Sequence, residues 1–592
     1  MTPARRRASG NIAMVAVVGV LLGSLVNRYT MAPPTSRLIN EASGSDTRTT
    51  TMEMEGDIDL GPTPRDEVID FGVVLRKAHP KHLKAFLAAL HDPSSPDFRK
   101  FLTPDEFGRR FGPSDAGIAE VTAWLDGRGF DVGVAPPQRT SLAVRGTVGA
   151  VNDAFGITMH DWVDEQGRPF RAPDRQPLIP APIRAHVTVV APLDTRPEES
   201  ASTPVLLALP GGYLQPAHVA RAFEIEELHA RNILGQGQSI GIISFDTFDD
   251  ADVAAFDRET DTAGRAGADP LPVQRVRLPN AATEPGADES EVNLDIDVIR
   301  TIAPAAQIIN YEAPNGPGYV ALVKEIVARQ EVDIVSISYG RCERKKLAER
   351  IAAEDVEFEA AAASGISFFI SSGDHGAHGC RFFPLPETNP QYRDLSLSVS
   401  SPGSEYLISV GGTYLTVGSD GSYVAEVGWE DPLTGWATGG GVSTVYPRPV
   451  WQVGVGVENE FSTGKRQVPD VAGPGDSDSG WLTVYTAASD TEPTRHISGG
   501  TSASAPFWAA SMLLVRQLAE DEGVHAPGFG RLGALGPLLY QLADAAEPGA
   551  LFHDVVRGGN LYHNAGVGWD YATGLGSPRV GPLARAIVDS LR

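Results

Sequence analysis

The larger part of the chain alternates short apolar segments with longer segments of helical periodicity. Residues 239–246, 333–340 and 366–374 are short, mostly apolar runs of the kind found in parallel strands. Between them, residues 317–330 and 348–365 repeat apolar side chains at the spacing of an amphipathic helix. Strands and helices in alternation predict a doubly wound α/β fold with a mostly parallel sheet. Ligands of such sheets bind at the carboxyl ends of the strands.

A smaller unit is predicted ahead of this one, over residues 63–192. Residues 68–77 alternate apolar and polar positions as a strand does. Residues 111–130 contain a helical pattern that Ser114 opens and Gly127 closes. We therefore expect a small α+β unit with strands and helices around one sheet.

Polar segments separate these units. Residues 27–62 are rich in Ser, Thr, Glu and Pro and predict a spacer. Residues 193–211 (LDTRPEESASTPVLLALPG) predict a linker on the same grounds. The second, larger unit then covers residues 212–592.

The N-terminus has the pattern of an export signal. Arg5, Arg6 and Arg7 precede an apolar run at residues 12–26, which is shorter than the roughly 20 residues that span a bilayer. Residues 1–26 therefore predict a signal peptide, with an uncleaved membrane anchor as the alternative because no clean cleavage site follows. We expect an exported protein, secreted or periplasmic, that contacts a membrane only if this segment is retained.

Charge and cysteine content narrow the choice of partners. The 592 residues include 75 Asp and Glu against 49 Lys and Arg, a net charge of -26. Nucleic-acid binding needs clustered cations, so this composition argues against it.

Cys342 and Cys380 are the only cysteines. In an exported chain they favour a disulfide over a metal site, and in a chain that is not exported they favour two buried thiols.

Two segments combine small residues with reactive side chains. SGGTSASAP (498–506) presents Ser502 at the start of a helix, where N–H groups can hold an oxyanion, although Gly-rich turns before Ala-rich helices are common. In ESEVNLDID (289–297), Glu291 and Asp295 are four residues apart and share a helix face. Two such carboxylates raise one of their pKa values, but the commoner meaning of this spacing is a solvated acidic face.

A third segment, SSGDHGAHG (371–379), places Asp374 directly after an apolar strand. A protonated carboxyl there could donate a hydrogen bond to a developing oxyanion. The competing interpretation is an Asx-type turn.

Together and in this order, the three segments resemble the signatures of the sedolisins, the serine-carboxyl peptidases, in their kumamolisin-like form. The resemblance covers residues 63–592, because SSPDFRKFLTPDEFGRRFGPS (94–114) resembles the family's activation propeptide. It implies a subtilisin-like catalytic domain at 212–592, preceded by a ferredoxin-like α+β prodomain at 63–192. The prodomain would inhibit its own enzyme until the linker at 193–211 is cut.

The resemblance also implies a role for each reactive residue. Ser502 would be the nucleophile, Glu291 the general base, Asp295 the residue that tunes Glu291, and Asp374 part of the oxyanion hole. A carboxylate base, with a reference pKa of about 4, works in acid where an imidazole is protonated. We therefore expect a monomeric, acid-acting endopeptidase that cleaves proteins or peptides through an acyl-enzyme and processes its own precursor.

The C-terminal segment FHDVVRGGNLYHNAGVGWDYATGLGSP (552–578) resembles the family's calcium site. Hard oxygen ligands in a Gly-rich loop suit one Ca²⁺ ion. The resemblance implies carboxylates from Asp554 and Asp570 and backbone carbonyls from Val555, Gly566 and Gly568. Cys342 and Cys380 also fall where some members of the family carry a bridge.

Two positions depart from the family pattern. Ser244 and Tyr339 stand where kumamolisin-like members often carry Glu and Trp, with Asp246 as a candidate substitute in the network around Glu291. Residues 436–449 resemble the strand that flanks the substrate.

Two other functions compete with this interpretation. A subtilisin-type Ser-His-Asp peptidase would need a suitable histidine, and His375 and His378 lie beside Asp374. A catalytically silent, calcium-stabilised secreted binding protein would lack Ser502, Glu291 or Asp374, and all three are present.

Overall fold

The computed structural model describes residues 57–200, 213–316, 318–380, 403–487, 490–524 and 531–592, and the backbone of 203–205. The predicted signal or anchor at 1–26 lies outside these residues. Among the helices that are described, none is both long enough and apolar enough to cross a membrane.

The N-terminal part of the described chain is an α+β unit built on a four-stranded antiparallel sheet in the order β3-β4-β2-β7. Its strands are β2 (Val68–Leu75), β3 (Asp131–Val132), β4 (Ser141–Thr147) and β7 (Val187–Val190). A second sheet joins β1 (Ile58–Pro62), β5 (Met159–Val163) and β6 (Pro169–Pro173). The helices are α1 (Pro80–Ala89), α2 (Pro104–Phe111), α3 (Asp115–Asp126) and α4 (Val148–Phe155).

Local sequence explains where the helices of this unit begin and end. The Ser114 side chain accepts a hydrogen bond from the Gly117 N–H at the start of α3, and Gly127 follows its last residue, as predicted. Helices α3 and α4 bury Val121, Leu125 and Val151 against one face of the sheet. This arrangement confirms the predicted small α+β unit.

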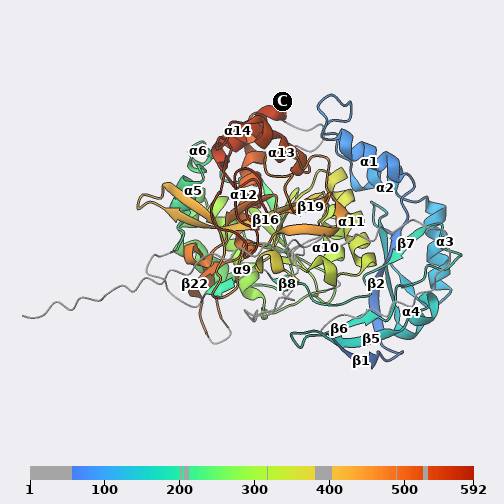
Figure 1. Cartoon of the computed structure of the whole chain (residues 1–592). Coiled ribbons are helices and arrows are strands. Elements are labelled where there is room, and N and C mark those ends of the chain that lie inside the picture. The colour runs from blue at the N-terminus through green and yellow to red at the C-terminus, as the bar shows by residue number, and fades with distance from the viewer. Residues whose placement is uncertain are drawn as a thin grey trace, which may run out of the picture. The chain divides into compact units, whose positions relative to one another are not determined.

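The larger unit is drawn from green to red in Figure 1. It is built on an eight-stranded sheet in the order β11-β12-β10-β13-β15-β16-β17, with β20 beside β16. Its strands are parallel except for the antiparallel edge pair β16–β17. In chain order they are β10 (Ser239–Ser244), β11 (Gln274–Arg277), β12 (Gln307–Glu312), β13 (Ile334–Ile337), β15 (Ser367–Ser371), β16 (Leu407–Val417), β17 (Tyr423–Gly428) and β20 (Val471–Pro474). The predicted doubly wound, mostly parallel sheet is confirmed.

Helices cover both faces of this sheet. Helices α9 (Glu289–Ile302) and α12 (Thr501–Asp521) pack with Ile240 and Ile242 of β10. Helices α10 (Gly318–Arg329) and α11 (Ala348–Ala363) pack with Ile243, which points to the opposite face. The alternation of Ile242 and Ile243 between two cores is the period-two pattern of a strand that is buried on both faces.

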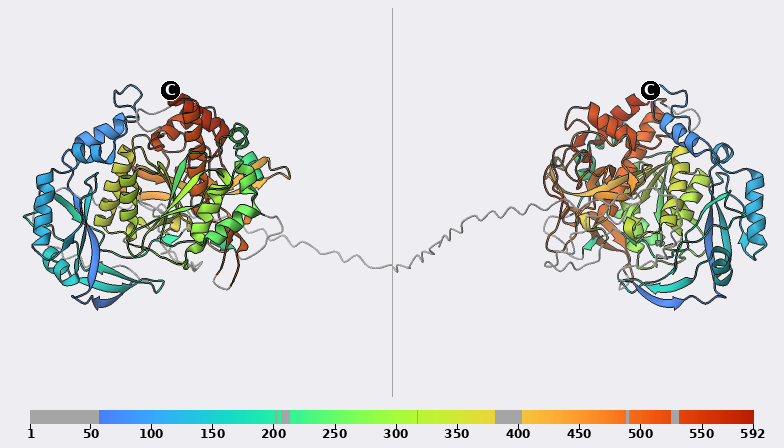
Figure 2. Two further views of the ribbon diagram at one scale, coloured as in Figure 1. Left: turned by 180° about the vertical axis from the view of Figure 1, so that it is seen from behind. Right: turned by 45° about the vertical axis from the view of Figure 1, so that its right-hand side comes forward.

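The prodomain sheet packs against the larger unit through α10 and α11. Val74 and Ala191 of the prodomain share a small core with Val320 and Val356. In both views of Figure 2 the blue prodomain strands lie beside these yellow-green helices. The prodomain therefore buries apolar surface of the catalytic unit.

The predicted strand at 333–340 is two strands in the structure. Strand β13 ends at Ile337, Ser338 interrupts the ladder, and β14 (Tyr339–Gly340) begins a separate pairing. Strand β14 leaves the central sheet because it pairs with β8 (Glu199–Ser200) of the linker. Ser338 consequently lies at the carboxyl end of β13, where such sheets carry their sites.

Candidate active site

Helix α9 carries the two carboxylates into the interior. Glu291 is 1% exposed and Asp295 0%, so the alternative of a solvated acidic face is wrong. The Ser338 hydroxyl donates a 2.7 Å hydrogen bond to Asp295 Oδ1, while Asp295 Oδ2 has no hydrogen-bond partner among the described residues. Burial, together with the neighbouring Glu291 carboxylate, raises the pKa of Asp295 well above its ordinary value. Asp295 therefore retains its proton to a higher pH than an exposed carboxyl.

Helix α12 presents Ser502 in its first turn, as the Gly-Gly-Thr-Ser sequence predicts. Gly500, with φ +98°, precedes the helix in a backbone conformation that a side chain would strain. The Ser502 hydroxyl lies 3.4 Å from the Ser338 carbonyl oxygen, to which it donates. The Ser338 hydroxyl in turn lies 3.2 Å from the Ser502 carbonyl oxygen. Ser338 thus contacts both Asp295 and Ser502.

Ser338 is a residue of the candidate site that sequence reasoning missed. Its signal in the sequence is a small polar residue within SISYG, at the end of an apolar strand. That signal is weak, because Ser336 in the same strand is also a buried serine. Only the break between β13 and β14 distinguishes the two.

Asp374 follows β15 and lies at the same helix start as Ser502. Its Oδ1 accepts hydrogen bonds from the Thr501 N–H (2.8 Å) and the Thr501 hydroxyl (2.9 Å). The Thr501 hydroxyl accepts a further bond from the Gly373 N–H at 2.9 Å. The structure therefore brings Asp374 to the residue that precedes the predicted nucleophile.

Two short strands of the linker pair with the catalytic unit at this site. On one side, Ser200 is in antiparallel register with Tyr339 and Glu199 with Gly340. The Ser200 hydroxyl donates a 2.5 Å hydrogen bond to Glu291 Oε2. On the other side, β9 (Thr203–Val205) pairs with β22 (Thr494–Gly499), which leads directly into α12. Backbone pairing of this kind is how proteins bind extended peptides.

The departures from the family pattern lie around the start of α9. Asp246 accepts hydrogen bonds from the backbone N–H groups of Gly286 (3.0 Å) and Asp288 (2.9 Å), just before α9. The Ser244 hydroxyl donates to the Asn310 side chain at 2.9 Å. Asp246 therefore holds the loop that positions α9 and its Glu291.

The histidines and the 436–449 segment lie on the Asp374 side of the site. His375 stacks on Trp436 with ring centroids 5.0 Å apart, and burial lowers the pKa of His375 to about 4. The Ala437 N–H donates to the Asp374 carbonyl at 2.9 Å. The described linker strands pair with β14 and β22, so a substrate-flanking role for 436–449 stays a prediction.

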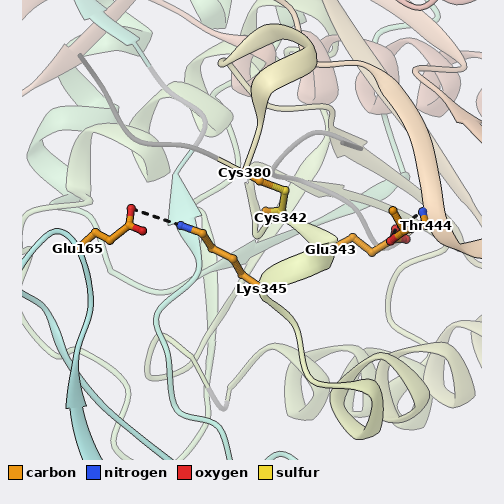
Figure 3. The surroundings of a disulfide bond; sticks show 6 residues. All are labelled: Glu165, Cys342, Glu343, Lys345, Cys380 and Thr444. Carbon is orange, nitrogen blue, oxygen red and sulfur yellow. Dashed lines mark hydrogen bonds and ion pairs between the residues drawn. A yellow bond between two sulfur atoms is a disulfide. The ribbon is translucent and has the colours of Figure 1, made fainter. Parts of the chain in front are cut away.

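The structure joins Cys342 and Cys380 in a disulfide just after β14 (Figure 3). Glu343 accepts bonds from the Thr444 N–H at 2.6 Å and its hydroxyl at 2.8 Å. These contacts tie the chain after β14 to two other segments of the catalytic unit.

The C-terminal segment folds back on itself, with β23 (Phe552–His553) paired to β24 (Ser577–Pro578). Asp554 accepts a bond from the Gly568 N–H (3.1 Å), and Asp570 accepts from the Gly566 N–H (2.9 Å). Both carboxylates therefore approach the same short loop.

Charge at this segment agrees with a cation site. Burial raises the pKa of Asp554, and it raises that of Asp570 to about 6. No ion pair to either side chain is found within the part of the chain that the structure describes. Among the described residues there is also no cluster of three His, Cys, Asp or Glu, and the expected set contains only two carboxylates. Two half-buried or buried carboxylates without a basic partner fit a hard cation.

Comparisons with known proteins agree with this architecture. Residues 55–196 match the family described as Pro-kumamolisin, activation domain, and residues 281–527 match the Subtilase family. Kumamolisin of Bacillus sp. (strain MN-32) is 32% identical over 565 residues, which cover 90% of this chain and 94% of that protein. Xanthomonalisin of Xanthomonas sp. (strain T-22) is 29% identical over 618 residues, covering 93% and 70% respectively.

A solved structure shows the same fold. Pseudomonas sedolisin, a serine-carboxyl proteinase complexed with two molecules of pseudo-iodotyrostatin, superposes with a TM-score of 0.50 at 25% identity. The match covers 64% of this chain and 99% of that structure. The chain therefore belongs to the sedolisin family of serine-carboxyl peptidases, and it carries that family's activation domain ahead of the peptidase domain.

Proposed function

We propose that this peptidase is an acid-acting endopeptidase whose nucleophile is Ser502 and whose first substrate is its own linker. The observation that carries the proposal is the course of the linker. Strand β8 of the linker pairs with β14, strand β9 pairs with β22, and Ser200 contacts Glu291. The bond to be cut would then lie between Ser200 and Thr203.

In the proposed acylation step, Glu291 accepts the proton of the Ser502 hydroxyl as Oγ attacks the carbonyl carbon of the scissile peptide bond. The C–N bond then breaks, and the leaving amine takes the proton from Glu291. In the second step water attacks the ester carbonyl and gives a proton to the same carboxylate. The ester C–O bond then breaks, Ser502 Oγ takes that proton from Glu291, and the peptide leaves with a new carboxyl group. In the precursor, Ser502 donates to Ser338 and Glu291 accepts from Ser200, so the step requires the Ser502 hydroxyl to turn toward Glu291.

In this proposal the carboxyl groups of Asp295 and Asp374 are both protonated during the reaction. The raised pKa of Asp295 keeps this buried carboxyl neutral, so that Glu291 alone carries the charge of the pair. With Oδ1 of Asp374 bound to Thr501, a proton on its Oδ2 would be donated to the oxyanion beside the N-terminus of α12. Asp374 donates only while it is protonated, and an acidic medium favours that proton, which supports an acidic optimum.

We further propose one structural Ca²⁺ ion at the C-terminal segment. The carboxylates of Asp554 and Asp570 would bind it together with backbone carbonyls of Val555, Gly566 and Gly568. When bound, the ion would neutralise the two carboxylates and hold the 554–570 loop closed. It has no part in the proposed reaction.

Export is part of the same proposal, and it is supported by the basic and apolar pattern of residues 1–26 and by the disulfide. A monomer is expected because one chain contains every proposed catalytic residue.

The function is tested by hydrolysis of a denatured protein at acid and neutral pH, with the Ser502→Ala and Glu291→Gln variants as controls. We expect activity in acid for the wild type and none for either variant. Activity in Glu291→Gln, or an optimum at neutral pH, would favour a subtilisin-type Ser-His-Asp mechanism instead.

A further inference from the structure

Glu198 lies in the linker two residues before Ser200, and it is bound like part of a substrate. The next residue, Glu199, is in register with Gly340, so the antiparallel pairing continues toward Arg341. The Glu198 N–H donates to the Asn315 side-chain oxygen at 2.6 Å, and the Asn315 amide donates back to the Glu198 carbonyl at 3.1 Å. Asn315 therefore recognises backbone atoms that any peptide would offer.

The Glu198 side chain enters a pocket made by the catalytic unit. It forms an ion pair with the Arg350 guanidinium and another, at 3.4 Å, with Arg341. The two arginine side chains are each 1% exposed and that of Glu198 is 0% exposed. Removal of one partner of such a buried pair leaves the other charge buried and unpaired, so it weakens binding more than the loss of an exposed pair does.

Removal of the prodomain and linker leaves this pocket cationic. Arg341 loses its partners Glu198 and Asp194, the latter at 3.1 Å, because both belong to the linker. Arg350 and Lys346 both keep Glu354 on α11, each at 3.0 Å. Three cations, Arg341, Arg350 and Lys346, then have one carboxylate between them, that of Glu354. Of the described residues, Glu349 is a further acid beside the pocket, and burial raises its pKa, so that it adds little negative charge in acid.

We propose that Arg341 and Arg350 form a subsite that selects an acidic side chain in the substrate, two residues before the position that Ser200 occupies. This inference rests on the proposed function, because it treats the linker as a substrate held in place. The substrates favoured by the mature enzyme are therefore peptides with Asp or Glu at that position.

An acidic medium does not abolish this preference. Although burial opposes ionisation, Arg341, Arg350 and Lys346 together lower the pKa of Glu198 to about 2. A glutamate in this pocket therefore stays charged while most free carboxyls are protonated. Its neighbour Glu199 differs, because burial raises the pKa of Glu199 to about 7 and its ion pair at 3.6 Å is with Arg168 of the prodomain.

The test uses mature enzyme and peptides that copy residues 194–206 of the linker (DTRPEESASTPVL). One peptide replaces the residue equivalent to Glu198 by Gln, and a matched control replaces the equivalent of Glu199 by Gln. At about pH 5, above the carboxyl reference value, we expect the first change to lower kcat/KM at least tenfold. The control change should cost much less, because its partner leaves with the prodomain.

An enzyme variant supplies the second arm. For the Arg350→Met enzyme, the ratio of kcat/KM for the peptide with Glu at the Glu198 position to kcat/KM for the peptide with Gln there should fall toward one. Equal cleavage of the Glu and Gln peptides by the wild type would overturn the inference, and so would a preference that survives Arg350→Met. The wild-type comparison decides the question even if the variant does not fold. Failure to cleave any peptide or protein would instead refute the proposed function.

Discussion

Ser200 of the linker donates a 2.5 Å hydrogen bond to Oε2 of Glu291, the carboxylate proposed as the general base. The precursor therefore engages its own base with a residue that precedes the bond to be cut. Because Ser200 also pairs with Tyr339 beside Ser338, one short stretch of linker contacts the base and lies next to the nucleophile's partner. Inhibition and readiness for self-cleavage follow from the same contacts.

The Glu291→Gln precursor should fold but remain uncut. The glutamine amide can still accept the Ser200 hydroxyl, so the site keeps its shape while it loses the base. We expect self-processing to slow by at least about 10³-fold. The measurement is the fraction of intact precursor over time in acid. Processing at the wild-type rate would remove Glu291 from the mechanism.

Two substitutions of Asp374 distinguish its two proposed roles, the contacts with Thr501 and the donation of a hydrogen bond to the oxyanion. Asp374→Ala removes both the Thr501 contacts and the donor to the oxyanion, and should cost about 10²–10³-fold in kcat. Asp374→Asn keeps an oxygen for Thr501 and supplies an N–H donor that does not titrate. Its activity should therefore decline less than that of the wild type as pH rises. Parallel pH profiles for Asn and wild type would contradict the role of a protonated donor.

Chelation of Ca²⁺ should destabilise the catalytic unit. We expect EDTA to lower the Tm of the Ser502→Ala precursor, and added Ca²⁺ to restore it, since a ligand that binds only the folded state stabilises it. The Asp570→Asn variant should have a lower Tm than the Ser502→Ala precursor, and neither EDTA nor Ca²⁺ should change it. If EDTA does not change the Tm of the precursor that retains Asp570, the site is refuted.

Glu426 on β17 predicts a defined dependence of stability on pH. It accepts hydrogen bonds from the hydroxyls of Thr413 (2.6 Å) and Ser577, and burial raises its pKa from 4.5 to about 7. The folded state therefore holds a proton that the unfolded chain releases between these two values, so the contribution to stability is lost as pH rises through that range. The loss is about 3 kcal/mol.

The Glu426→Gln side chain does not titrate, so this variant should not lose stability in this way as pH rises. Both proteins carry Ser502→Ala, which prevents self-digestion. As pH rises from 4.5 to 7, the unfolding midpoint of the Gln variant should increase relative to that of the parent. A difference between the two proteins that stays constant over this range would show that Glu426 titrates normally.

Periodicity along the chain predicts the elements of the fold that are decided locally. Helix α11 was expected at 348–365 and runs from Ala348 to Ala363, and α3 begins after Ser114 as its cap predicts. The three motifs also converge at one edge of the sheet, because β15 ends there and α9 and α12 begin there. This convergence follows from the topology of a parallel sheet.

Long-range contacts account for what the sequence did not predict. The break at Ser338 exists because β14 pairs with a linker strand that lies far away in the chain. Glu291 and Asp295 are buried because α9 is packed against α12 and the sheet, whereas their spacing alone is typical of a solvated face. The pairing of Glu198 with Arg350 joins residues 152 positions apart, and no local pattern marks it.

The most direct test of the central claim is a mass-spectrometric time course of the purified precursor in acid, beside Ser502→Ala. We expect that the wild type alone is cut, and that the first cut falls between Ser200 and Thr203. The rate should not change with protein concentration, because each linker is already bound at the active site of its own chain. A first cut elsewhere, or cutting of Ser502→Ala at the wild-type rate, would contradict it.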